Sequence, residues 1–96
     1  MLTKTLEIDG VKFTLAESTA GAIEDYQDAM NVAVGDRDRV LASRRFICHC
    51  LGRGGQPMTP EEFREKVTLT GQVLLDEEAI AISQARRTTK GEAAGP

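Results

Sequence analysis

Lys4 to Leu15 (KTLEIDGVKFTL) is the stretch that decides the fold of this 96-residue chain. Two short segments of alternating apolar and polar residues meet at Asp9-Gly10, a pair favoured in two-residue type I′ turns because both turn positions need positive φ. The resulting register pairs Ile8 with Val11, Leu6 with Phe13, Glu7 with Lys12 and Thr5 with Thr14. We therefore predict a β-hairpin, residues 4–15, with one apolar face that covers helices and with outer edges free to pair with a partner's strand.

Four helices are predicted after the hairpin, at about residues 20–34, 37–51, 60–67 and 70–87. Ser18 or Thr19 can cap the first helix, which Gly35 would end, and Asp36 can cap the second. The third has the clearest start, because Thr59 can cap, Pro60 suits the first turn and Glu62 completes a capping box.

Apolar residues at helical spacing indicate which faces are buried. The first helix offers Ile23, Tyr26, Met30 and Val34, the second Val40, Ile47 and Leu51, and the fourth Leu74, Leu75, Ile80 and Ile82. We predict structural roles for Leu6, Ile8, Phe13, Ile23, Tyr26, Val40, Ile47, Phe63 and Leu74.

These elements predict the α+β class, with an N-terminal β-hairpin packed on a small bundle of three to four α-helices. The length suits one domain, residues 1–87, and residues 88–96 have no apolar anchor larger than Ala, so we expect a flexible C-terminal tail. With four aromatic residues and no Trp the core is modest, and we expect a homo-oligomer that buries further surface.

The net charge of -3 argues against a general nucleic-acid binder, but the charge is uneven. Five arginines and two aspartates lie between Asp36 and Arg53. Such a segment can dock an acidic partner, pair with a second copy, or form a solvated helix face. We predict that Arg37, Arg44 and Arg45 contact a partner; Arg44 lies within the apolar stripe of its helix.

No pattern predicts catalysis or a cofactor. Cys48 and Cys50 flank His49, but zinc needs about four converging ligands and neighbouring side chains on a helix diverge by roughly 100°. The same divergence argues against a Cys-His nucleophile, and the paired carboxylates lie where helix starts favour negative charge. We expect no enzyme activity, no metal and no cofactor.

The chain is expected to stay in the cytoplasm where it is made. No window approaches the roughly 20 apolar residues of a membrane span, and no signal peptide is recognisable. Two close cysteines fit reduced thiols.

Residues 6–23 (LEIDGVKFTLAESTAGAI) resemble the opening of phage tail assembly chaperones of long-tailed phages, in which a hairpin leads into a leucine, acidic, threonine-alanine-glycine stretch and a first helix. The matching positions are Leu15, Glu17, Thr19, Ala20, Gly21 and Ile23. The resemblance implies a non-enzymatic protein that binds the long helical tape measure protein in the host cell cytoplasm and helps to recruit tail tube subunits.

Two other functions remain open at this point. A small structural virion protein, such as a tail connector or completion protein, would have the same features. A small DNA-binding regulator would use the second and third helices as a helix-turn-helix, although its linker and acidic third helix argue against it.

Overall fold

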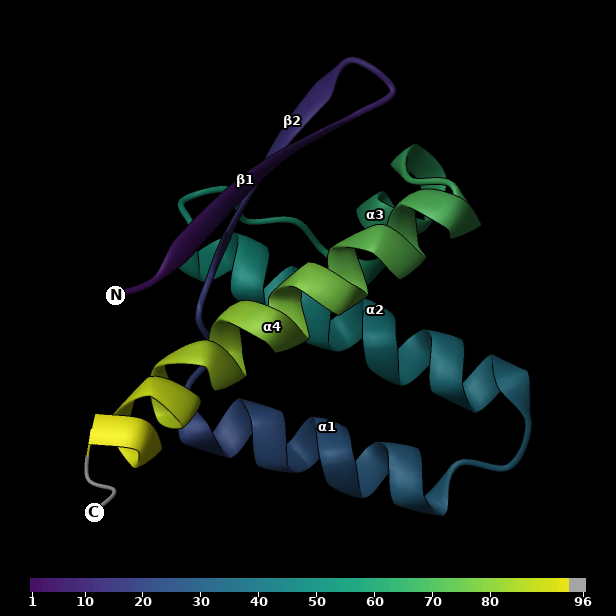
Figure 1. Cartoon of the computed structure of the whole chain (residues 1–96). Coiled ribbons are helices and arrows are strands. Elements are labelled where there is room, and N and C mark those ends of the chain that lie inside the picture. The colour runs from purple at the N-terminus through teal and green to yellow at the C-terminus, as the bar shows by residue number, and fades with distance from the viewer. Residues whose placement is uncertain (94–96) are drawn as a thin grey trace.

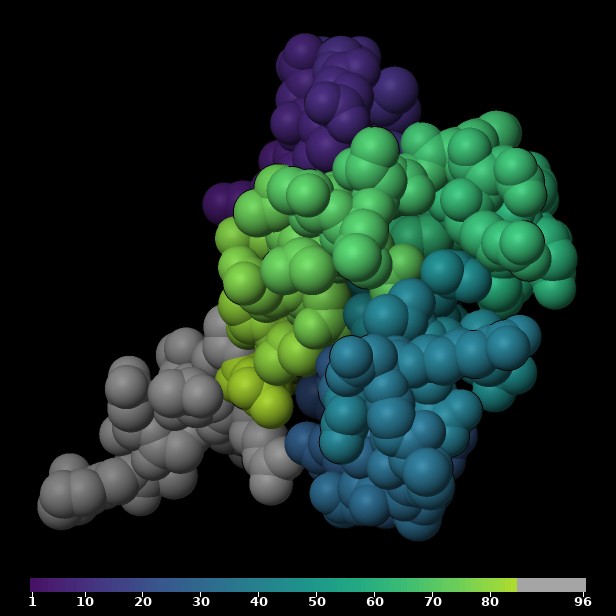
Figure 2. Space-filling view, turned by 90° about the vertical axis from the view of Figure 1, so that its right-hand side faces the viewer, coloured from purple at the N-terminus to yellow at the C-terminus, as the bar shows by residue number. Residues whose placement is uncertain are grey.

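The computed structural model describes the backbone of residues 1–93 and the side chains of residues 1–84. An N-terminal antiparallel hairpin precedes four helices, which confirms the predicted α+β class (Figure 1). The elements are β1 (Thr3–Ile8), β2 (Val11–Ala16), α1 (Ala20–Val32), α2 (Asp36–Arg53), α3 (Pro60–Lys66) and α4 (Leu69–Ala93). Figure 2 shows the tip of the hairpin projecting beyond the helices.

The hairpin has the predicted turn and register. Asp9 and Gly10 both have positive φ, and all four predicted residue pairs are present. On the outer face the hydroxyls of Thr5 and Thr14 form a hydrogen bond of 3.1 Å. The turn therefore decides which side chains of the two strands face the helices.

The core is assembled around α2, which contacts β2 and each of the other three helices. Its buried members come from every element except β1 and α1: Phe13, Leu15, Phe46, Ile47, Cys48, Cys50, Leu51, Phe63, Leu75 and Ala79. Leu6, Ile8, Ile23 and Tyr26 are partly buried against this cluster. Eight of the nine residues predicted to be structural are thus at least partly buried, counting Val40.

Helix α1 differs from the prediction at its end. No residue of α1 is fully buried, and Val34, predicted to lie in its buried stripe, is exposed. The helix stops at Val32 and Ala33 adopts an extended conformation, so Val34 no longer follows the helical direction. At the other end the prediction of a cap was right, because the Thr19 hydroxyl accepts a hydrogen bond from the Ala22 amide at 3.2 Å.

The predicted cap of α2 is wrong. Asp36 is the first residue of the helix, Gly35 with φ 90° occupies the cap position, and no side chain caps the start of α2. The carboxylate of Asp38 instead accepts a hydrogen bond from the Val34 amide at 3.0 Å, which closes the connection from α1. Helix α3, by contrast, has the complete predicted capping box between Thr59 and Glu62.

The predicted apolar face of α4 is wrong at Leu74 only, because Leu75 is buried and Ile80 and Ile82 are partly buried against the core. Leu75 is fully buried, whereas Leu74 is 46% exposed, and the buried face is completed by Gly71, Gln72 and Ala79. The helix continues beyond Arg87 to Ala93, since no proline interrupts it before Pro96 and a glycine such as Gly91 only weakens a helix. The predicted flexibility of residues 88–96 stays a prediction, because the side chains of this segment and its last three residues lie outside the described part of the chain.

The connection from α2 to α3 covers the outer edge of β2. The Gln56 side chain accepts a hydrogen bond from the Thr14 amide at 2.6 Å and donates one to the Lys12 carbonyl at 3.2 Å. Gly54 lies so close to the Thr14 carbonyl that a Cβ atom there would collide with it. The side-chain amide of Gln56 thus takes the place of a third strand beside β2.

Candidate protein-binding cleft

A cleft with a volume of about 590 Å³ separates the first half of α2 from the starts of α3 and α4. Figure 2 looks onto this side of the molecule, where the blue residues of α2 lie below the green residues of α3 and α4. The cleft is lined by Asp36, Arg37, Val40, Leu41, Arg44, Pro60, Glu61, Arg64 and Leu69. Three helices therefore contribute to a single surface.

The lining combines exposed apolar side chains with charged groups. Val40, Leu41 and Leu69 supply the apolar part, and Leu69 at the start of α4 is 65% exposed. Three arginines and two carboxylates surround them. A gathered apolar surface with a polar rim is typical of a site that binds another protein.

Arg44 is held in position from below by Gln72, which is only 5% exposed. The Gln72 side chain donates a hydrogen bond to the Val40 carbonyl at 2.8 Å and accepts one from Arg44 Nε at 3.4 Å. Arg44 is therefore a half-buried residue at the wall of the cleft, and the bond to Gln72 uses its Nε and not its terminal nitrogens. Preorganisation of this kind lowers the entropy that is lost on binding.

Of the three predicted contact residues, the structure brings two together. Arg37 and Arg44 are seven residues apart on α2, so they point in nearly the same direction and both line the cleft. Arg45 lies one residue further, roughly 100° around the helix, and lines a groove against α1 instead. The prediction treated the three as one set, and helix geometry divides them.

Sequence reasoning missed Leu41, Arg64 and Leu69 as members of the cleft, and Gln72 as the residue that holds Arg44. A signal for Leu69 was present, because Thr68 is a good capping residue and its hydroxyl accepts a hydrogen bond from the Gly71 amide at 3.1 Å. A helix that begins at Thr68 places Leu69 in its first turn. Gln72 carried no such signal, since its burial depends on how α4 crosses α2.

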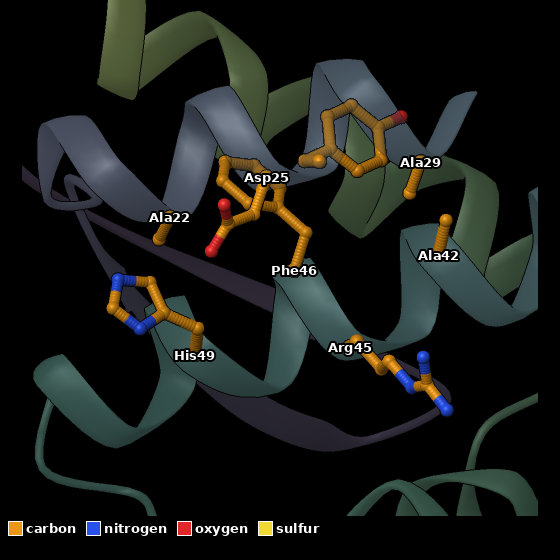
Figure 3. A pocket seen from close by; sticks show the side chains of 8 residues that line it. Ala22, Asp25, Ala29, Ala42, Arg45, Phe46 and His49 are labelled. Atoms are coloured by element: carbon orange, nitrogen blue, oxygen red, sulfur yellow. The ribbon is translucent and has the colours of Figure 1, made fainter. Parts of the chain in front are cut away.

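The groove between α1 and α2 is smaller, with a volume of about 290 Å³ (Figure 3). Ala22, Ala29 and Ala42 line it, and the rings of Tyr26 and Phe46 stack with centroids 4.7 Å apart. His49 points towards the start of α1, where its Nε2 accepts a hydrogen bond from the Thr19 amide at 3.3 Å.

His49 is half-buried, and its ring takes part in the packing of α1 on α2. Burial, and then the nearby charge of Arg53, hold the pKa of His49 below its ordinary 6.5, so the imidazole is neutral at pH 7 and can accept this bond. Two polar side chains that line the groove, His49 and Tyr26, form hydrogen bonds that support the fold.

The two thiols belong to the core. Cys48 and Cys50 are buried, and burial raises the pKa of each to about 11, so both are protonated at neutral pH. Within the described part of the chain no three His, Cys, Asp or Glu side chains gather as a metal site.

A polar junction beneath the groove joins three helices. Asp76 on α4 accepts hydrogen bonds from the Tyr26 hydroxyl on α1 at 3.2 Å and from the Ser43 hydroxyl on α2 at 2.7 Å. Burial, and then the Asp76 charge, raise the pKa of Tyr26 to about 12. Asp76 therefore fixes the relative positions of α1, α2 and α4.

Within the described residues, none of the helices has the length and apolar character needed to cross a membrane. Comparison of the chain with known protein families, with curated proteins and with solved structures gives no match.

Proposed function

We propose that this chain is a non-enzymatic protein-binding factor and that the cleft between α2, α3 and α4 binds an amphipathic helix of its partner. The observation that carries the proposal is the exposed side chain of Leu69 beside Val40 and Leu41, bordered by the fixed guanidinium of Arg44. Helix-in-groove recognition uses such a surface, because an apolar stripe fills the cleft while flanking charges meet its rim.

The charges of the lining define the partner's chemistry. Arg37, Arg44 and Arg64 outnumber Asp36 and Glu61, so the cleft favours a helix with an apolar stripe flanked mainly by Asp and Glu. Among the ion pairs formed by residues 1–84, neither Arg37 nor Arg44 takes part, so both can pair with an incoming carboxylate.

We further propose that the partner is a phage tape measure protein and that the chain is a tail assembly chaperone of a long-tailed phage, acting in the cytoplasm of the host cell. This step rests on the resemblance of residues 6–23. A long helical client presents many apolar stripes in succession, which suits a small protein that binds one stripe at a time. Recruitment of tail tube subunits is part of the same proposal.

The test is co-expression with a long coiled-coil protein of the tape measure type from the same genome, followed by affinity purification and mass measurement of the complex. Leu69→Glu should weaken binding at least about tenfold, because burying a leucine is worth about 1.5–3 kcal/mol and the new carboxylate repels an acidic helix. Val32→Glu is the matched control: Val32 is 75% exposed on α1 and lies outside the cleft.

Equal binding by the Leu69→Glu and Val32→Glu variants would show that the cleft is not the binding site. A wild-type chain that fails to form any complex with the coiled-coil protein would remove the proposed client. Recovery of the chain in purified virions would instead identify it as a structural component.

A further inference from the structure

The two edges of the hairpin are not equivalent. The outer edge of β2 is covered, since Gln56 bonds both the Thr14 amide and the Lys12 carbonyl. In an antiparallel pair, residues opposite each other direct their backbone groups the same way, both inwards or both outwards. Because Thr14 and Lys12 point outwards, their partners Thr5 and Glu7 also point outwards, from β1.

The outer edge of β1 is open. No backbone bond from Thr3, Thr5 or Glu7 to a group outside the hairpin occurs among residues 1–84, and all three residues are exposed. An open row of amide and carbonyl groups can accept another strand, and a two-stranded sheet alone is marginally stable. In Figure 1 this strand runs above α4.

A groove of about 430 Å³ accompanies the open edge. It lies between β1 and α4 and is lined by Lys4, Thr5, Leu6, Glu7, Ile8, Leu74, Glu77 and Glu78. Leu74, the residue expected in the core, is exposed here. Glu77 and Glu78 form no salt bridge with any described residue, and neither does Lys4. An added strand would therefore meet an apolar side chain and two unpaired carboxylates.

We propose that β1 of a second copy of this chain occupies that edge, antiparallel and with the two-fold axis at Thr5. This register pairs Thr5 with Thr5 of the second copy and Thr3 with Glu7 of the second copy, so every outward-pointing residue of β1 gains a partner. The two hairpins then form one continuous four-stranded sheet.

Charge and backbone conformation together select this register over the neighbouring ones. With the two-fold axis at Lys4, the Lys4 side chains of the two copies would face each other, and with the axis at Glu7 the two Glu7 side chains would do so. Like charges directly opposite each other destabilise a strand pair. An axis at Leu6 would pair Thr3 with Asp9, whose positive φ takes it out of the ladder. With the axis at Thr5, Lys4 of the second copy lies opposite Leu6, on the face that the groove shares with Glu77 and Glu78.

The second copy therefore supplies the missing charge. Opposite-charge contacts form twice, once on each side of the axis, between Lys4 of one copy and the Glu77-Glu78 pair of the other. Complementarity of this kind sets both orientation and partner choice.

The backbone part is tested by sedimentation of the full chain from micromolar to near-millimolar concentration. The wild type should be a reversible dimer. Thr5→Pro should be a monomer with an unchanged far-UV circular dichroism spectrum, because proline removes an outward amide that the hairpin does not use. Thr5→Val, which keeps the amide and the β-branched shape, should still dimerise.

The charge part is tested by two variants, Lys4→Glu and the double variant Glu77→Lys/Glu78→Lys. Each alone opposes like charges and should be monomeric. An equimolar mixture should form a heterodimer, because the carboxylate introduced in the first variant then meets the lysines introduced in the second. On the other side of the axis, the native Lys4 of the second variant meets the native glutamates of the first. This arm decides the question even where the proline variant fails to fold.

Three results would overturn the proposal. The first is a wild type that stays monomeric throughout the range, including one that binds only an added extended peptide. The second is a folded Thr5→Pro variant that still dimerises. The third is a charge-swapped mixture that stays monomeric.

Discussion

At the scale of single residues, the ionisation of Tyr26 can be measured by absorbance without a contribution from another tyrosine or from tryptophan. It is the only tyrosine and the chain has no Trp, so absorbance of the phenolate reports this group alone. Burial and Asp76 raise its pKa from 10.0 to about 12. We predict that absorbance titration of the folded protein gives a midpoint near pH 12, and that the same titration in denaturant gives one near 10.

The sign of the linked stability follows from the direction of the shift. The folded state holds the Tyr26 proton more tightly than the unfolded state, so this contribution is complete below pH 10 and is lost as the pH rises towards 12. Asp76→Asn should lower the folded midpoint, since it removes the charge that opposes phenolate formation. A native midpoint equal to that in denaturant would contradict the buried junction of Tyr26, Ser43 and Asp76.

At the scale of elements, the contact between the end of α2 and β2 depends on a missing side chain. Gly54→Ala would place Cβ against the Thr14 carbonyl and displace Gln56 from the strand. Overpacking of this kind costs about 1–3 kcal/mol, and the lost hydrogen bonds add to it. We predict a clear fall in the urea midpoint of unfolding.

Gly52 is the matched control for Gly54. It lies two residues earlier within α2, and a Cβ atom there would have no neighbour within 4 Å. Gly52→Ala should leave stability unchanged or raise it by up to about 1 kcal/mol, through helix propensity. Equal destabilisation by both substitutions would mean that the loop does not pack on the strand.

The elements also show what sequence alone can predict. The hairpin register was predictable because Asp9-Gly10 decides it locally, and the α3 start because Thr59 and Glu62 satisfy each other's backbone. The α2 start was not, because Asp36 and Asp38 compete for the same connection and the geometry of Gly35 selects between them. The sequence could not show which of Leu74 and Leu75 is buried, since this depends on how α4 crosses α2.

The cleft was predictable only in part, for the same reason. Arg37 and Arg44 share a direction that their spacing on one helix reveals. Leu69 and Arg64 join them through the packing of three helices, which no local pattern encodes. The prediction grouped Arg45 with Arg37 and Arg44 because it assumed that the basic segment has a single face. On the helix, Arg45 lies on a different face from the other two.

At the scale of the whole molecule, the cleft and the β1 edge have no lining residue in common. We predict that the two binding events are separable. Thr5→Pro should keep its affinity for the coiled-coil partner per site but lose the avidity that two linked clefts provide. Leu69→Glu should lose the partner and remain a dimer.

Sedimentation of each variant with and without the coiled-coil protein measures both properties together. Loss of partner binding in a folded Thr5→Pro monomer would show that one surface depends on the other.

The side chain of Gln56 affects how many copies of the chain can join through their hairpins. A sheet with two open edges can add copies without limit and become a fibre, whereas a sheet with one edge covered can join a second copy only through its open edge and then stops. Because Gln56 forms hydrogen bonds with the Thr14 amide and the Lys12 carbonyl, only the outer edge of β1 is open in the hairpin. In the proposed assembly, the side-chain amide of Gln56 thus limits the sheet to two copies of the chain.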